Sequence, residues 1–371
     1  MLPEFAVTDP FSSTYREGRS RFCAAAHAAG GTIESFVMPD RAGPVGEELA
    51  IDAVRFGAAD AQRLLLTSCG LHGLEAAGGS AAMVNWLMQG GASRLPDGVA
   101  VVLVHPLNPF GWAYASRGNE DGIDLNRNAL DWSAPIPTNL AYETLHPIVI
   151  ANEPDTAGLA AFSGAFAALA RQHGMEWALG AVASGQYAFP DGLSFGGAEQ
   201  AWSTQVAKEI AEKHKPNRGR TLILDWHTGI GPWAEPFFIL DAARDSADHR
   251  LVSSWWPDRS IHCDDVVEGA SIAYRGVLAD RLRREIEEHE GGKALSLTVE
   301  WGTYDIDRMV EALLMDNWLR HRAGGAPERQ DWIREQLIER FIPSDPRWRD
   351  AVIEGSEAIF EDAILAVSSW H

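Results

Sequence analysis

The chain has 371 residues, of which 46% are apolar, so it can bury a large core. Its 31 Lys and Arg against 52 Asp and Glu give a net charge of −21 at pH 7, which repels nucleic acid and anionic membranes. We therefore expect neither as a partner. The three cysteines, Cys23, Cys69 and Cys263, include no Cys-x-x-Cys pair. They predict no disulfide framework and no thiolate metal site, and they favour a reducing, cytoplasmic setting.

No segment of the sequence is predicted to direct export or to span a membrane. The amino-terminal residues lack a basic stretch followed by an apolar one. The most apolar long window, residues 159–182, is interrupted by Arg171, Gln172, His173 and Glu176, so we do not expect it to cross a bilayer.

Hydrophobic periodicity predicts the elements in chain order. A helix is expected over residues 12–29, ending at Gly30-Gly31, and then an antiparallel strand pair at 32–38 and 49–56. Continuous apolar runs, typical of strands buried on both faces, follow at 64–68, 99–105, 221–226, 237–240 and 294–301. Helices are expected between them at 76–89, 158–173, 199–214 and 271–289.

This alternation predicts an α/β fold, a three-layer α/β/α sandwich with a mixed, mostly parallel central sheet. We expect one catalytic domain over residues 1–371, with a core of about 30–304 and a helical carboxy-terminal extension over 305–371. In that extension Ile333, Leu337 and Phe341 form one apolar stripe, which either packs in the core or mediates self-association.

Residues 132–153 are predicted to be a long loop. The segment contains Pro135, Pro137 and Pro147 and few periodic apolar positions. Such a loop is either an ordinary surface excursion, which the sequence favours, or a lid over a site.

The strongest chemical signal is a pair of short motifs that each follow an apolar run. His72 and Glu75 come after residues 64–68, and His227 comes after 222–224. Two imidazoles and one carboxylate are the ligand set of a catalytic zinc that keeps one coordination position open. Both motifs would lie at strand ends, where α/β sheets place their sites.

Further motifs lie between the proposed ligands. They are Asn108-Pro109-Phe110-Gly111, then Arg117, then the run Gly122-Ile123-Asp124-Leu125-Asn126-Arg127-Asn128. With these, residues 64–303 resemble the zinc carboxypeptidase family, and within it a bacterial branch related to succinylglutamate desuccinylase and aspartoacylase. The resemblance implies one zinc ion bound by His72, Glu75 and His227.

The resemblance also implies roles for the neighbouring residues. Asp124 matches the acid that hydrogen-bonds the first ligand histidine, and Arg117 matches the arginine that steadies the oxyanion. Asn126 and Arg127 match the residues that hold the terminal carboxylate of the substrate, which a planar guanidinium can bind through both oxygens.

A fourth motif lies in residues 295–303. Glu300 matches the general base of the family, which takes a proton from an activated water and passes it to the leaving nitrogen. Tyr274 is the best match for a substrate-contacting loop tyrosine. Gln186, Tyr187 and Trp301 are weaker candidates for the border of the pocket.

The function expected from these residues is zinc-dependent hydrolysis of an amide bond next to a free carboxylate, without a covalent intermediate. The substrate is either a small peptide or an N-acyl amino acid, and the motifs suit both. A non-catalytic zinc-binding protein is the rival of another class, although it would not need Glu300. A cysteine hydrolase using Cys69 leaves the other motifs unexplained, and Gly78-Gly79-Ser80-Ala81-Ala82 lacks the final glycine of a nucleophile elbow.

Overall fold

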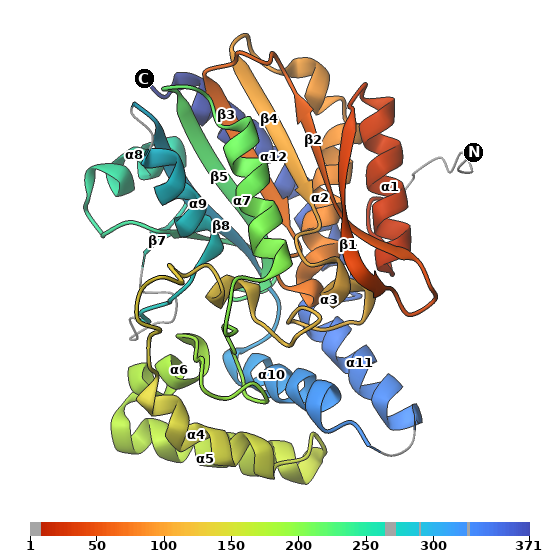
Figure 1. Cartoon of the computed structure of the whole chain (residues 1–371), viewed down its shortest axis with the longest axis vertical. Helices are drawn as coiled ribbons and strands as arrows, with labels where there is room; N and C mark the ends of the chain where they lie inside the picture. Colours follow the sequence, from red (N-terminus) through yellow and green to blue (C-terminus); the bar gives the residue numbers. More distant parts are fainter. Residues whose placement is uncertain (1–8, 264–271, 289–290, 325–326) are drawn as a thin grey trace.

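The structure, a computed structural model, describes residues 9–263, 272–288, 291–324 and 327–371. Within these ranges eight strands form one sheet of order β1-β2-β4-β3-β5-β8-β6-β7 (Figure 1). The strands are β1 Ile33–Ala42, β2 Glu48–Phe56, β3 Arg63–Cys69, β4 Val99–His105, β5 Arg220–Gly229, β6 Pro236–Leu240, β7 Ile261–His262 and β8 Lys293–Gly302.

The sheet is mixed, with a parallel centre. Strands β4, β3, β5 and β8 are parallel neighbours, and β6 pairs in parallel with β7. The pairs β1–β2, β2–β4 and β6–β8 are antiparallel. The predicted fold class and the predicted amino-terminal antiparallel pair are confirmed. The short strand β7 was not predicted, because two residues carry no readable periodicity.

Helices cover both faces of the sheet. In Figure 1, α7 and α9 lie in front of the strands, and α2 and α12 lie behind them. The helices are α1 Tyr15–Ala28, α2 Ala76–Met88, α3 Pro109–Ala113, α4 Leu140–Ala151, α5 Thr156–His173, α6 Met175–Ala183, α7 Trp202–His214, α8 Ala247–Trp255, α9 Leu278–Glu287, α10 Ile306–His321, α11 Pro327–Phe341 and α12 Pro346–Ser369.

Alternation along the central strands explains the two layers. Leu64 and Leu66 of β3 belong to the core beneath α7 and α9, whereas Leu65 belongs to the core beneath α2 and α12. Because successive side chains on a strand point to opposite faces, a strand must be apolar at every position to support both layers. The carboxy-terminal stripe of Ile333, Leu337 and Phe341 is buried in the core beneath α2 and α12, which confirms the prediction that it packs in the core.

The prediction of a long loop over residues 132–153 is wrong, because residues 140–151 form helix α4. The Asn139 side chain accepts a hydrogen bond from the Tyr142 amide and begins the helix. Tyr142, Leu145 and Val149 are buried on one side. Pro147 removes only one intrahelical hydrogen bond, and tertiary packing offsets this loss.

Helices α4, α5 and α6, which we call the helical cap (residues 140–183), lie below the sheet in Figure 1. They share a third core with α10, built from residues such as Tyr142, Phe162, Leu179 and Leu314. Helix α6 was not separated from α5 in the sequence, where both fall within one apolar window.

The predicted helix over residues 271–289 is confirmed only for Leu278–Glu287. Ser271 and His289 lie outside the described residues. Residues 272–277 are not helical, and Gly276 has a left-handed φ of 66°. A β-carbon at Gly276 would lie 2.2 Å from the Arg127 carbonyl oxygen, so the loop requires glycine for this close approach.

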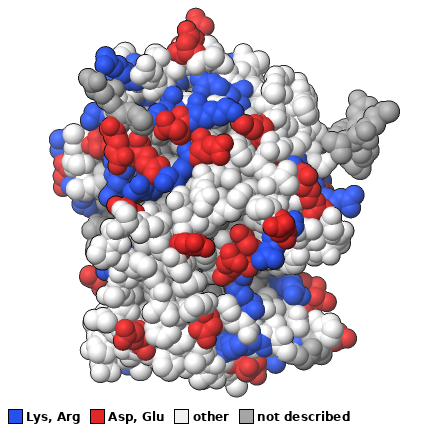
Figure 2. Space-filling view, viewed as in Figure 1, with Lys and Arg blue, Asp and Glu red and all other residues white. Residues whose placement is uncertain are grey.

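The net charge of −21 is not gathered into a single acidic patch on the face shown in Figure 2. There, acidic and basic side chains alternate around α9, where Arg283 pairs with Asp280 and Glu287, and Arg281 pairs with Glu285. None of the helices within the described ranges is long and apolar enough to cross a membrane.

Helix α2 approaches the sheet closely enough to require glycine at position 79. A β-carbon there would lie 2.6 Å from Cys69 Cβ and 2.7 Å from Trp226 Cβ. We expect Gly79→Ala to lower the free energy of unfolding by about 1–3 kcal/mol, because overpacking outweighs the gain in helix propensity. Urea denaturation measures this. Gly164→Ala on α5, where a β-carbon meets nothing within 4 Å, is the control and should be neutral or stabilising.

Candidate metal centre and cavity

The carboxyl ends of β3, β5 and β8 bring the predicted site residues together. After β3 the chain passes through His72 into a 3₁₀ turn, Gly73–Glu75. On β5, His227 lies directly beside Glu300 of β8 in the parallel register. Residues from three distant parts of the chain therefore meet at one edge of the sheet, as the strand-end argument predicted.

His72, Glu75 and His227 form one buried cluster whose possible ligand atoms all lie within 4.8 Å of one another. The Nδ1 atom of His72 lies 2.9 Å from Glu75 Oε1, and the Nδ1 atom of His227 lies 2.8 Å from Glu75 Oε2. The Thr228 amide also donates to Glu75 Oε2 at 3.3 Å. The carboxylate is thus fixed between the two imidazoles.

The other nitrogen of each imidazole is held by a second carboxylate. His72 Nε2 lies 3.1 Å from Asp124 Oδ1, and His227 Nε2 lies 2.7 Å from Asp225 Oδ2. With each Nε2 held by one of these carboxylates, the Nδ1 of each imidazole faces Glu75 at the centre of the cluster. The predicted contact of Asp124 with His72 is present.

Asp225 was missed in the sequence. It is 3% exposed, and its Oδ1 accepts a hydrogen bond of 2.6 Å from Ser68, its neighbour on β3. The sequence does contain a signal for Asp225. Residues two apart on a strand face the same side of the sheet, so the side chains of Asp225 and His227 have to lie on the same face. Ser68 could not be assigned in this way, since its position depends on the pairing of β3 with β5.

The cluster perturbs the acidity of its members. Burial alone would raise the pKa of Glu75, but the imidazoles of His72 and His227 outweigh it and hold this pKa below its usual range. Burial would lower the pKa of His227, yet Asp225 and Glu75 raise it well above its usual value. For Asp124, Arg117 and His72 overcome burial and lower the pKa.

The donor set fits a zinc ion. Two imidazoles whose Nε2 atoms are held by carboxylates, together with one further carboxylate, are the kind of ligand set that catalytic zinc takes from proteins. In the described residues this is the one group of three or more His, Cys, Asp or Glu side chains arranged to hold a metal. Ligation by the two Nδ1 atoms and Glu75 is therefore the arrangement that this geometry supports.

Arg117 contacts the cluster directly. Its guanidinium donates to Glu75 Oε1 at 3.2 Å and to Asp124 Oδ2 at 3.2 Å. Burial would lower its pKa, but Asp124 and Glu75 raise it. In this structure Arg117 balances the charge of two buried carboxylates at the edge of the cavity.

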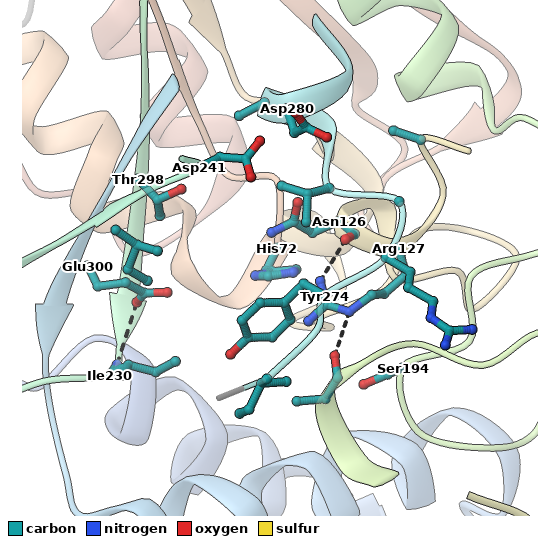
Figure 3. Close-up of a pocket in the computed structure, with 18 of the residues that line it drawn as sticks. His72, Asn126, Arg127, Ser194, Ile230, Asp241, Tyr274, Asp280, Thr298 and Glu300 are labelled. Atoms are coloured by element: carbon teal, nitrogen blue, oxygen red, sulfur yellow. Dashed lines mark hydrogen bonds between the residues drawn. The ribbon is translucent and has the colours of Figure 1, made fainter. Parts of the chain in front are cut away.

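Glu300 lies in the cavity beside the cluster. Its side chain is 8% exposed, and its Oε2 accepts a hydrogen bond from the Ile230 amide at 3.5 Å (Figure 3). Burial raises its pKa to about 7, and the charge of Glu75 adds to this effect while His227 opposes it. A carboxylate in this position can accept and release a proton near neutral pH.

A cavity of about 770 Å³ connects these groups. Figure 3 shows His72, Asn126, Arg127, Tyr274 and Glu300 around the same space. The predicted site residues that line it are His72, Glu75, Arg117, Asn126, Arg127, Tyr274 and Glu300.

Residues outside the predicted set complete the walls. Apolar side chains come from the helical cap and from the carboxy-terminal helices, namely Leu179, Val182, Met309, Val310, Leu313 and Phe341. Gln186, Tyr187 and Trp301 are not among the lining residues, so they do not border the pocket as expected. Trp301 instead lies in the core, where Gly355 of α12 packs against its ring.

Arg127 and Tyr274 lie against each other. The guanidinium is 4.9 Å from the centre of the Tyr274 ring, a cation–π contact. Asn126 Oδ1 accepts a hydrogen bond from the Leu278 amide at the start of α9. That contact leaves the amide nitrogen of Asn126 as the polar group available on the cavity side.

The rival nucleophiles are poorly placed. Cys69 is fully buried, and burial raises the pKa of its thiol well above the usual value. Ser80 is also buried, and its hydroxyl lies 2.9 Å from His105 Nε2. Neither residue lines the cavity.

The sequence was compared with models of known protein families. The family model described as protein of unknown function (DUF2817) matches residues 11–355, so the chain belongs to this family. No curated protein matches the sequence.

Several solved structures are similar to this chain. A candidate metallopeptidase from Shewanella amazonensis SB2B is 16% identical with a TM-score of 0.42, over 83% of this chain and 93% of that one. Carboxypeptidase A from Helicoverpa armigera is 12% identical with a TM-score of 0.46, over 94% and 74%. A candidate succinylglutamate desuccinylase/aspartoacylase from Shewanella frigidimarina NCIMB 400 is 12% identical with a TM-score of 0.38, over 79% and 72%.

The contact between Asp225 and His227 predicts an effect on metal affinity. We expect Asp225→Asn to weaken zinc binding by about 10–100-fold, because the amide cannot supply the negative charge that makes the imidazole a better ligand. Competition with a chromogenic chelator measures the affinity. Asp131→Asn, whose carboxylate bonds only Ser133 among the described contacts, is the control. Equal affinities for the two variants would contradict the role of Asp225.

Proposed function

We propose that this protein is a zinc-dependent hydrolase that cleaves an amide bond next to a free carboxylate. One observation carries the proposal: a cluster of three side chains that could ligate a metal opens through His72 and Glu75 onto one cavity, which a buried glutamate with a raised pKa and a buried arginine also line. The cavity volume, about 770 Å³, suits a small peptide or an N-acyl amino acid.

The proposed metal ligands are His72, Glu75 and His227. A zinc ion held there would polarise a carbonyl oxygen and lower the pKa of a water molecule. Glu300, at the neighbouring register position, would take the proton from the water and deliver it to the nitrogen that leaves. No nucleophilic side chain is required for this reaction.

Arg127 is the proposed carboxylate-binding residue, and the side-chain amide of Asn126 lies beside it. A guanidinium binds a carboxylate through two parallel hydrogen bonds, and burial strengthens such a pair. Arg127 is 4% exposed and still lines the cavity, so a carboxylate bound there would be largely shielded from water. Arg117, which already balances Glu75 and Asp124, adds positive charge near the carbonyl that is attacked.

A deacylase acting on N-acyl amino acids is the second candidate, because it would use the same groups. The apolar wall formed by the helical cap and α10 offers a site for an acyl chain of limited size. A non-catalytic zinc-binding protein is disfavoured by Glu300. This buried carboxylate has no cationic partner among the described contacts, which is costly, and metal binding alone gives no reason to keep it at the cavity wall.

Glu300→Gln separates proton transfer from metal binding. We expect this variant to keep one zinc per chain and to lose turnover by about 10²–10⁴-fold, because glutamine cannot accept the proton. Metal content is measured by plasma emission spectrometry and turnover by amine release.

His227→Ala is the contrasting variant, and we expect it to lose the metal itself. Full activity of Glu300→Gln would remove the general-base assignment. Stoichiometric zinc in His227→Ala would remove the ligand assignment.

A panel of paired substrates tests the carboxylate and the reaction class. N-acetyl dipeptides and N-acetyl amino acids are each assayed with a free and with an amidated carboxylate. We expect the free forms to be preferred, and Arg127→Met to reduce the preference by about 10–100-fold, the cost of one charge-assisted hydrogen-bond pair. Equal cleavage rates for the free and the amidated form of a substrate would contradict the proposed substrate class. The class of compound that is cleaved decides between peptidase and deacylase.

A further inference from the structure

The helical cap contacts the site through residues 183–187, which comprise the last residue of α6 and the four residues after it. Arg127 Nε donates to the Ala183 carbonyl at 2.7 Å, and the Tyr187 hydroxyl donates to the Arg127 carbonyl at 2.6 Å. Between them, Gly185 lies against the aliphatic part of the arginine. Side chain and backbone of Arg127 are thus both held by residues 183–187.

These contacts restrict how the guanidinium can bind a ligand. Of its five N–H groups, Nε–H is bound to Ala183 and one Nη1–H to the Asn126 carbonyl at 2.6 Å. Within the described residues the remaining hydrogens on Nη1 and Nη2 have no protein acceptor. The Ala183 carbonyl occupies the edge formed by Nε and Nη2, so a carboxylate has to approach across the edge formed by Nη1 and Nη2.

The segment is itself fixed to the helical cap. Asn139, which begins α4, donates from its Nδ2 to the carbonyls of Ala181 and Gly185 at 3.3 and 3.1 Å. Ser194 donates to the Val182 carbonyl at 2.7 Å. The position of the Ala183 carbonyl therefore follows from how the helices of the cap pack together, in a core separate from those of the sheet.

We infer that residues 183–187 position Arg127, and that the helical cap thereby sets the affinity for the carboxylate of the substrate without supplying a catalytic group. This inference rests on the proposed function, since it takes Arg127 as the carboxylate-binding residue. It assigns to the cap a role in substrate affinity, while His72, Glu75, His227 and Glu300 lie at the carboxyl ends of β3, β5 and β8.

Gly185→Ala is the direct test. The φ of Gly185 is 93°, and a β-carbon there would lie 2.8 Å from Arg127 Cδ, so the arginine has to move. We expect KM for the cleaved free-carboxylate compound of the panel to rise about tenfold, with kcat changed less than about twofold. The amidated form of the same compound should keep its KM.

Gly174→Ala is the matched control. Its φ is 95°, so alanine introduces a similar backbone strain in the same cap, but its β-carbon would meet nothing within 4 Å. We expect this variant to lose stability with wild-type KM. Tyr187→Phe, which removes only the hydroxyl bonded to the Arg127 carbonyl, should raise KM in the same direction as Gly185→Ala.

Crystal structures of the two glycine variants give a readout that does not depend on turnover. The expected result is a displaced Arg127 side chain in Gly185→Ala and the original contact with Ala183 in Gly174→Ala. Wild-type KM together with an unmoved Arg127 in Gly185→Ala would overturn the inference. If Arg127→Met leaves the preference for free carboxylates unchanged, the proposed function fails instead, so the two failures are distinguishable.

Discussion

The parallel pairing of β5 with β3 on one side and with β8 on the other is the constraint on which the site depends. Its register places Asp225 beside Ser68 and His227 beside Glu300. A shift of one residue would turn His227 to the opposite face of the sheet. The apolar residues that alternate along these strands fill two different cores. The same packing that stabilises the sheet therefore assembles the cluster.

The two imidazoles are held by carboxylates in unlike surroundings. Asp124 forms an ion pair with Arg117, and it also accepts a hydrogen bond from the backbone amide of Asn126. Asp225 is bonded to the hydroxyl of Ser68, which carries no charge. A buried carboxylate without a cationic partner is costly unless its neighbour becomes positive or binds a cation. Asp225 therefore depends on the His227 imidazole for positive charge, whereas Asp124 has Arg117 as well.

Local patterns in the sequence predict the central strands, and short motifs together with the family resemblance predict most residues of the candidate site. Runs such as 64–68 and 221–226 mark strands buried on both faces, and His72, Glu75 and Asp124 lie in short motifs. Helix α4 is not evident from the sequence, because Pro135, Pro137 and Pro147 are typical of a loop and only a few positions, such as Tyr142, Leu145 and Val149, carry the helical apolar pattern. The contact between the Ala183 carbonyl and Arg127 could not be predicted at all. It involves a backbone atom from a distant helix, and a carbonyl is present at every residue.

The cluster has a consequence for how the chain folds. Its members come from the turn after β3 and from β5, and Glu300 comes from β8. The binding centre therefore exists only after β3 and β5 have paired. Any ion that binds this centre and not the unfolded chain shifts the folding equilibrium of the whole sheet. Occupancy would thus act on the lifetime of the entire protein and not on a local loop.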